Sequence, residues 1–144
     1  EKQTLYAKQF IDFNKAPETL SKQEQIETVI KVLEKFVDFF YSNISKELII
    51  LLLKEQQNEE FKVKSPAFDY LVKLIACVFN KKVNEREIIF KTLFIISQVN
   101  SARILPAFSL RRLGQDNFLP EDIKIIKENV KFYFKALLKE SNIV

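Results

Sequence analysis

Apolar residues return every three or four positions along most of the chain, a spacing typical of amphipathic α-helices. The clearest example follows Ser21 and Glu24, which form an S-x-x-E capping box and predict a long helix that ends near Tyr41. A shorter helix is predicted before it, over residues 3–14, because Pro17 follows and closes it. The apolar stripe of the long helix consists of Ile26, Val29, Ile30, Leu33, Val37 and Phe40.

Two further helices are predicted from caps and from proline. Ser45 begins a helix with the run "ELIILLLKEQQ", which is apolar around most of its circumference and therefore predicts a central position in the fold. Ser65 and Pro66 begin the next helix, since proline is tolerated at a first helical position. The apolar stripe of that second helix consists of Phe68, Leu71, Val72, Ile75 and Phe79.

Three more helices complete the chain. Asn84 with Glu87 predicts the cap of a helix that contains "EREIIFKTLFIISQ". Pro106 is expected to begin a short helix that Gly114 ends in the left-handed conformation. Pro120, followed by an acidic first turn, begins a long final helix. The pattern thus predicts an all-α fold of about seven helices.

A 40-residue period relates parts of this helix series. The tripeptide Pro66-Ala67-Phe68 returns as Pro106-Ala107-Phe108, and "KELII" at 46–50 precedes "REIIF" at 86–90 by the same interval. The chain therefore divides into three blocks, each of which reads as a helix, a short loop and a longer helix. These blocks are 25–64, 65–104 and 105–144.

The segments at 66–98 and 104–117 resemble the armadillo/HEAT type of helical repeat, whose period is about 40 residues. The resemblance covers about 120 residues. It implies a right-handed superhelix of three stacked helix pairs, preceded by one short helix. Peptide-binding armadillo arrays carry Trp and Asn in their groove, whereas this chain has no Trp and has Gln98 where an Asn is expected. The alternative is a single compact helical bundle without repeats.

Composition removes most catalytic classes. The 144 residues, 47% apolar and 29% charged, fit one globular domain over 1–144. The absence of histidine excludes Ser-His-Asp and Cys-His catalysis as well as imidazole zinc sites, and the single glycine excludes phosphate-binding glycine loops. Cys77 lies among apolar residues, which favours a buried, inert thiol. We therefore expect no enzyme activity, no cofactor and no metal site.

The cysteine count, the length of the apolar runs and the N-terminus indicate the cellular location. One cysteine permits no intrachain disulfide, no apolar run reaches the roughly 20 residues that span a bilayer, and the polar N-terminus does not resemble a signal peptide. We expect an intracellular protein, cytoplasmic or nuclear, without membrane insertion. Because the chain contains no Met, it is interpreted as a fragment of a larger protein.

Basic residues gather near the C-terminus of a chain whose net charge is +4. Five lysines on the last helix share one face, and either they form its solvated side or they bind an acidic partner or phosphates. They are Lys124, Lys127, Lys131, Lys135 and Lys139. Three of the four arginines, Arg103, Arg111 and Arg112, flank the short helix. Arginine forks onto carboxylates and phosphates, so these three are candidate partner contacts; structural ion pairs are the alternative.

The last helix also has a wider apolar surface than one neighbour needs. Ile125, Phe132 and Ala136 widen its main stripe, which consists of Ile123, Ile126, Val130, Tyr133, Phe134 and Leu137. Terminal repeats usually expose a polar face, so we interpret Phe132 and Tyr133 as contacts for another protein. The alternative is that the first helix covers this surface with Leu5, Phe10 and Phe13.

Together these patterns predict a protein-protein interaction or scaffold module of a larger intracellular protein or complex. Its partner is another protein, and an acidic surface on that partner would match the basic residues. The alternative is a helical nucleic-acid-binding domain that uses the lysines of the last helix.

Overall fold

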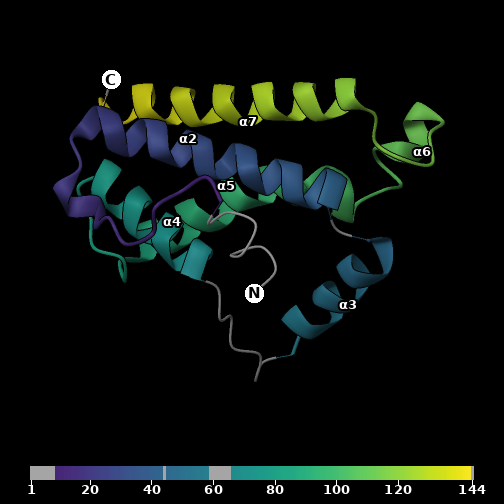
Figure 1. The fold of residues 1–144 in the computed structure, drawn as a ribbon, viewed down its shortest axis with the longest axis horizontal. Helices are drawn as coiled ribbons and strands as arrows, with labels where there is room; N and C mark the ends of the chain where they lie inside the picture. The colour runs from purple at the N-terminus through teal and green to yellow at the C-terminus, as the bar shows by residue number, and fades with distance from the viewer. Residues whose placement is uncertain (1–8, 44, 59–65, 144) are drawn as a thin grey trace.

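The computed structural model describes residues 9–43, 45–58 and 66–143. This part of the chain contains six α-helices, two short turns of other helix types and no strand (Figure 1). The all-α prediction is therefore confirmed for the described residues. Of the predicted first helix, residues 3–8 lie outside them, and residues 9–14 form turns and extended chain instead of a helix.

Helix α2 (Lys22–Asp38) begins where the capping box predicts, after the single 3₁₀ turn η1 (Pro17–Thr19). The Ser21 hydroxyl accepts a hydrogen bond from the Glu24 amide at 3.1 Å, and the Glu24 carboxylate accepts one from the Ser21 amide at 3.0 Å. The helix runs on into the π-helical turn η2 (Phe39–Asn43), so its predicted end near Tyr41 is confirmed within the usual uncertainty of helix ends.

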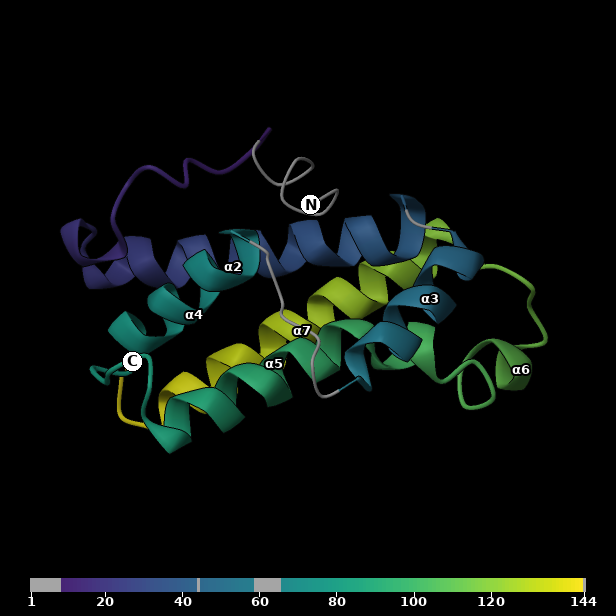
Figure 2. The ribbon, with the colours of Figure 1, turned by 90° about the horizontal axis from the view of Figure 1, so that it is seen from below.

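Four helices enclose the main core: α2, α4 (Pro66–Val78), α5 (Arg86–Ile104) and α7 (Pro120–Glu140). Helix α2 packs against the other three, and α5 also packs against α4 and α7 (Figures 1 and 2). The largest fully buried side chains come from all four helices: Leu33, Phe36, Leu71, Leu74, Ile75, Ile88, Phe134 and Leu138. The first and last long helices are thus neighbours, and the four form a bundle.

The predicted stack of three helix pairs is not confirmed. Phe68 is half-buried in the first turn of α4, whereas Phe108 is 70% exposed in the turn before α6 (Leu110–Leu113), so the two Pro-Ala-Phe copies do not occupy equivalent positions. The physical reason is that α6 has only four residues and cannot act as the first helix of a pair. Helix α7 instead buries Val130, Phe134 and Leu138 and packs against α2 and α5, while Tyr133 of its predicted stripe is half exposed.

Two predicted helix starts are wrong. Asn84 does not cap α5: Glu85 precedes the helix, and the Glu85 carboxylate accepts a hydrogen bond from the Lys82 amide at 2.9 Å. Pro106 lies in a turn, because a regular helical bonding pattern begins only at Leu110.

Three other predicted helix boundaries are confirmed. Gly114 ends α6 with a φ of +67°, the left-handed conformation that glycine adopts without steric cost. Pro120 begins α7, and Asp122 accepts a hydrogen bond from the Leu119 amide at 2.7 Å. Pro66 is the first residue of α4, although its predicted cap, Ser65, lies outside the described residues.

Helix α3 (Lys46–Gln56) begins at Ser45 as predicted, and the Ser45 hydroxyl accepts a hydrogen bond from the Leu48 amide at 3.2 Å. Its predicted central position is wrong. Over residues 46–55, whose burial the structure describes, only Ile49 is buried, in a small separate cluster with Phe39, while Ile50 and Leu51 are more than half exposed. The helix is apolar around its circumference, but the bundle contacts only one side of it.

The described N-terminal segment, residues 9–16, packs on α2 and α4. The Phe13 ring meets Tyr70 of α4 edge-on at 5.2 Å between centroids, and the Tyr70 hydroxyl donates a hydrogen bond to the Lys15 carbonyl at 2.7 Å. The Lys35 ammonium of α2 lies 3.8 Å from the centroid of the Phe10 ring. Phe10 and Phe13 therefore do not cover α7, and Leu5 lies outside the described residues.

Candidate functional site

Helix α5 carries apolar side chains on its outer side as well as its inner side. Ile88, Thr92, Ile95 and Val99 recur at helical spacing and are buried in the bundle. The outward positions of a bundle helix are normally polar. Here four outward side chains are apolar and between 52% and 62% exposed: Ile89, Phe90, Leu93 and Phe94.

Helix α7 exposes apolar side chains beside them. Val130, Phe134 and Leu138 are buried, but Phe132 is 64% exposed and Tyr133 is 50% exposed. The rings of Phe132 and Tyr133 meet edge-on, with centroids 5.5 Å apart. The structure therefore places both residues on the surface, where the sequence analysis expects partner contacts.

A groove of about 490 Å³ lies between α5 and α7, which run side by side and antiparallel (Figure 2). Its lining is mainly apolar and consists of Phe90, Phe94, Ile95, Tyr133, Ala136 and Leu137. The polar residues along it are Glu87, Lys91, Gln98 and Glu140. Such a composition favours contact with an apolar surface.

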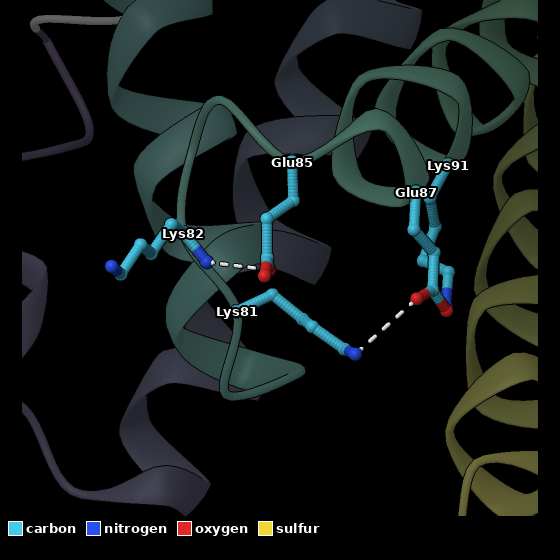
Figure 3. A network of polar contacts seen from close by, with 5 residues as sticks. All are labelled: Lys81, Lys82, Glu85, Glu87 and Lys91. Carbon is cyan, nitrogen blue, oxygen red and sulfur yellow. Dashed lines mark hydrogen bonds and ion pairs between the residues drawn. The ribbon is translucent and has the colours of Figure 1, made fainter.

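One end of this groove carries a small ionic network (Figure 3). The Glu87 carboxylate lies 3.2 Å from the Lys91 ammonium and 3.4 Å from the Lys81 ammonium. Hydrogen bonds from Lys91 and then Lys81 lower the pKa of Glu87 below its usual value. Lys91 also lies 4.2 Å from the centroid of the Phe79 ring. The Glu87 charge is thus paired within the chain, and because two ammonium groups share one carboxylate, this ionic network keeps a net positive charge.

We name six residues the α5–α7 face: Ile89, Phe90, Leu93, Phe94, Phe132 and Tyr133. Each is at least half exposed. Three of them, Phe90, Phe94 and Tyr133, line the groove, and at roughly 100 Å² of exposed area for each side chain they present about 300 Å² of apolar surface there. The largest apolar patch on a typical monomer is roughly 300–600 Å² and is often functional. The part of the α5–α7 face that lines the groove alone reaches the lower end of that range.

One of the five lysines of α7 forms an ion pair within the chain. The Lys127 ammonium lies 2.6 Å from the Asp38 carboxylate, and this ion pair joins α7 to α2. The other four lysines are exposed and remain candidates for an acidic partner: Lys124, Lys131, Lys135 and Lys139.

The three arginines are also divided. Arg103 is half-buried, and its guanidinium carbon lies 5.9 Å from the centroid of the Phe118 ring. The Tyr41 ring meets Phe118 edge-on at 4.7 Å, and the Tyr41 hydroxyl donates a hydrogen bond to the Val99 carbonyl at 2.7 Å. Burial raises the pKa of Tyr41 to about 12. Arg103 therefore takes part in the packing where α2 meets α5.

Arg111 and Arg112 lie instead on α6 and are exposed. They remain candidate partner contacts, separate from Arg103.

The described residues bring together no group of three or more metal-ligating side chains. Cys77 is half-buried, and this burial raises the pKa of its thiol, which disfavours the reactive thiolate. No helix within the described ranges has the length and apolarity needed to cross a membrane. What the arrangement offers is an apolar contact surface bordered by charged side chains.

The α5 half of this surface is absent from the sequence predictions. Ile89, Phe90, Leu93 and Phe94 form adjacent apolar pairs, which a helix with one buried side does not need. That excess is the signal that could have identified them. No protein-family model matches the sequence, and no curated protein is significantly similar to it.

Proposed function

We propose that this chain is a non-catalytic protein-interaction module that binds an amphipathic helix of another protein in the groove between α5 and α7. The observation that supports it most strongly is the α5–α7 face, where six large apolar side chains stay at least half exposed and three of them, Phe90, Phe94 and Tyr133, line an apolar groove. Burying such a surface against a partner removes it from water at a favourable rate of about 25 cal/mol per Å².

A helical partner suits the shape and chemistry of this groove. Two antiparallel helices leave an elongated furrow into which a third helix can place its apolar side chains at i, i+4 and i+7. A helix satisfies its own backbone hydrogen bonds, so it needs only apolar contact. An extended peptide has free backbone N–H and C=O groups that a strand edge or polar side chains must bond, and this groove has a mainly apolar lining in a described chain without strands.

The net charge of the chain and the exposed lysines of α7 favour an acidic partner; these lysines do not line the groove, whose own charged residues are Glu87, Lys91 and Glu140. The net charge of the chain is +4, and four lysines of α7 are exposed. Opposite charge across an interface mainly raises the rate of association and selects the partner. We therefore infer a partner whose apolar helix is accompanied by acidic residues, in a larger intracellular protein or complex.

The proposal is tested by capture with matched variants. The tagged chain is incubated with native extract, and two variants that place a charge in the groove, Phe94→Asp and Tyr133→Asp, are treated in the same way. The control variant is Lys73→Asp on α4, an exposed position that does not line the groove. Circular dichroism first establishes that each variant is folded. A partner identified this way is purified, and its Kd is measured for all four proteins.

We expect the wild type and Lys73→Asp to bind alike, and the two groove variants to bind at least tenfold more weakly, because each buries a charge in an apolar interface. Equal affinity of all four proteins for the purified partner would refute the groove as the binding site.

Nucleic-acid binding is the second candidate function, favoured by the four exposed lysines of α7. If all four contact phosphates of duplex DNA, the logarithm of affinity falls with the logarithm of salt concentration with a slope of about −4. Titration of DNA and RNA at two salt concentrations measures this slope. Tight, salt-sensitive binding that is lost in Lys131→Glu and Lys135→Glu would contradict protein docking as the main function.

A further inference from the structure

Helix α3 stands apart from the four helices of the bundle. None of the side chains buried in the main core belongs to α3. Its own buried residue, Ile49, packs with Phe39 in a second, small cluster, to which Leu48, Leu52, Leu53, Phe40 and Ile104 add half-buried contacts. In Figures 1 and 2 the helix lies beside the end of the bundle and not between its helices.

The attachment of α3 consists of these aliphatic and aromatic contacts. Within the described chain, the side chains of residues 46–55 form no ion pair or hydrogen bond with another helix. Ile50 and Leu51 face water on the other side. A helix of 11 residues is marginal in water without packing, so its order depends on a small contact area.

We propose that α3 is a hinged arm that opens from the end of the bundle while the bundle stays folded. Elements with few buried apolar contacts open locally, far more often than the whole protein unfolds. In the open form Phe39 and Ile104 are uncovered, and the aliphatic side of α3 is released. This end of the molecule therefore alternates between a closed and an open form, independently of whether the α5–α7 groove binds a partner.

Hydrogen–deuterium exchange on the whole chain, read by mass spectrometry, tests this proposal. We expect the backbone amides within α3 to show measurable protection but to exchange at least 100-fold faster than those in the middle of α2 and α4. Protection of α3 equal to that of α2 and α4 overturns the proposal, because α3 then opens only with the bundle. Complete absence of protection in α3 also overturns it, because no closed form then exists.

Two neighbouring isoleucines supply a matched pair of variants. Ile49→Ala removes the buried contact with Phe39, whereas Ile50→Ala removes a side chain that is more than half exposed. We expect Ile49→Ala to speed exchange in α3 by at least tenfold and to leave α2, α4 and α7 unchanged. Ile50→Ala should change the exchange of α3 by less than threefold. If Ile49→Ala speeds exchange throughout the bundle, α3 is an integral part of the core and the proposal is wrong.

Discussion

The two sides of the bundle differ in how many large apolar side chains they expose to water. Within the described residues, α2 and α4 expose no large hydrophobic side chain, although both contribute heavily to the core. Helices α5 and α7 belong to the same core, yet seven of their large apolar side chains are at least half exposed. These seven are the six residues of the α5–α7 face and Ile125.

The chain itself supplies part of the reason. Residues 9–16 lie against α2 and α4, with Ile11 buried and Phe13 against Tyr70. No described segment covers the α5–α7 face in the same way. An apolar helix surface is stable in water when another segment buries it. On the side of α2 and α4, residues 9–16 of the chain itself provide that cover. On the other side we expect a partner to provide it.

Two leucines provide the sharpest contrast between the two sides. Leu74 of α4 is fully buried, whereas Leu93 of α5 is 52% exposed. We expect Leu74→Ala to lower the free energy of unfolding by about 2–5 kcal/mol, because it leaves a cavity in the core. Leu93→Ala should lower it by less than about 0.5 kcal/mol. Urea unfolding followed by circular dichroism measures both, and similar losses would show that the α5–α7 face is already buried in the free chain.

The arginines provide a second contrast, between the half-buried Arg103 and the exposed Arg111 and Arg112. We expect Arg103→Ser to cost about 1–2 kcal/mol of unfolding free energy, because the guanidinium stacks on Phe118 and its stem is half-buried. The double variant Arg111→Ser, Arg112→Ser should stay within about 0.5 kcal/mol of the wild type. Thermal and urea unfolding provide the comparison; an equal loss in both variants would mean that α6 is packed more firmly than its exposure indicates.

Tyr41, where α2 meets α5, predicts a loss of stability at high pH. The pKa of its hydroxyl is about 12 in the folded chain, raised from 10.0 by burial, so the folded state favours the neutral form. Below pH 10 the hydroxyl is neutral in both the folded and the unfolded chain. As the pH rises from 10 to 12 the unfolded chain loses this proton first, so the free energy of unfolding falls. At pH 11 this costs about 1 kcal/mol.

Tyr41→Phe has no hydroxyl to ionise and is the control for this measurement. Between pH 9 and pH 11 its unfolding free energy should fall by about 1 kcal/mol less than that of the wild type. Identical slopes in the two proteins would show that Tyr41 is accessible to water.

The smallest expected effect concerns the lysines of α7. Lys127→Gln removes the ion pair with Asp38 and should cost about 0.5 kcal/mol at low salt, a loss that 1 M salt screens away. Lys135→Gln, at an exposed position of the same helix, should change stability by less than that. Urea unfolding at low and high salt tests the pair, and a salt-independent loss at Lys127 would assign its role to packing instead of charge.

Local signals in the sequence predict most of the helix starts, while the starts expected at Asn84 and Pro106 are wrong. The capping box at Ser21, the cap at Ser45 and the left-handed Gly114 are confirmed, because each depends only on residues within a few positions. The repeat arrangement depends instead on which helices pack together. The recurring tripeptide that ends at Phe68 and at Phe108 carries no information on that choice.

The candidate site shows the same limit. Phe132 and Tyr133 are predictable because α7 has more apolar surface than its neighbours bury. The excess apolar surface of α3 and α5 is equally visible in the sequence, but periodicity reports only the direction of a side chain and not what covers it. For α3 that ambiguity leads to the wrong central position, and for α5 it leaves the exposed side chains Phe90 and Phe94 without a prediction.

Site-specific photo-crosslinking tests the docking of a partner helix on the α5–α7 face most directly. The photoreactive residue p-benzoylphenylalanine is introduced in place of Phe94 on α5 or, as the control, in place of Lys73 on α4, and each protein is irradiated in native extract. The account predicts one dominant adduct from position 94, mapped by mass spectrometry to an amphipathic helix of the partner, and none from position 73. The same adducts from both positions, or adducts from position 73 alone, would contradict it.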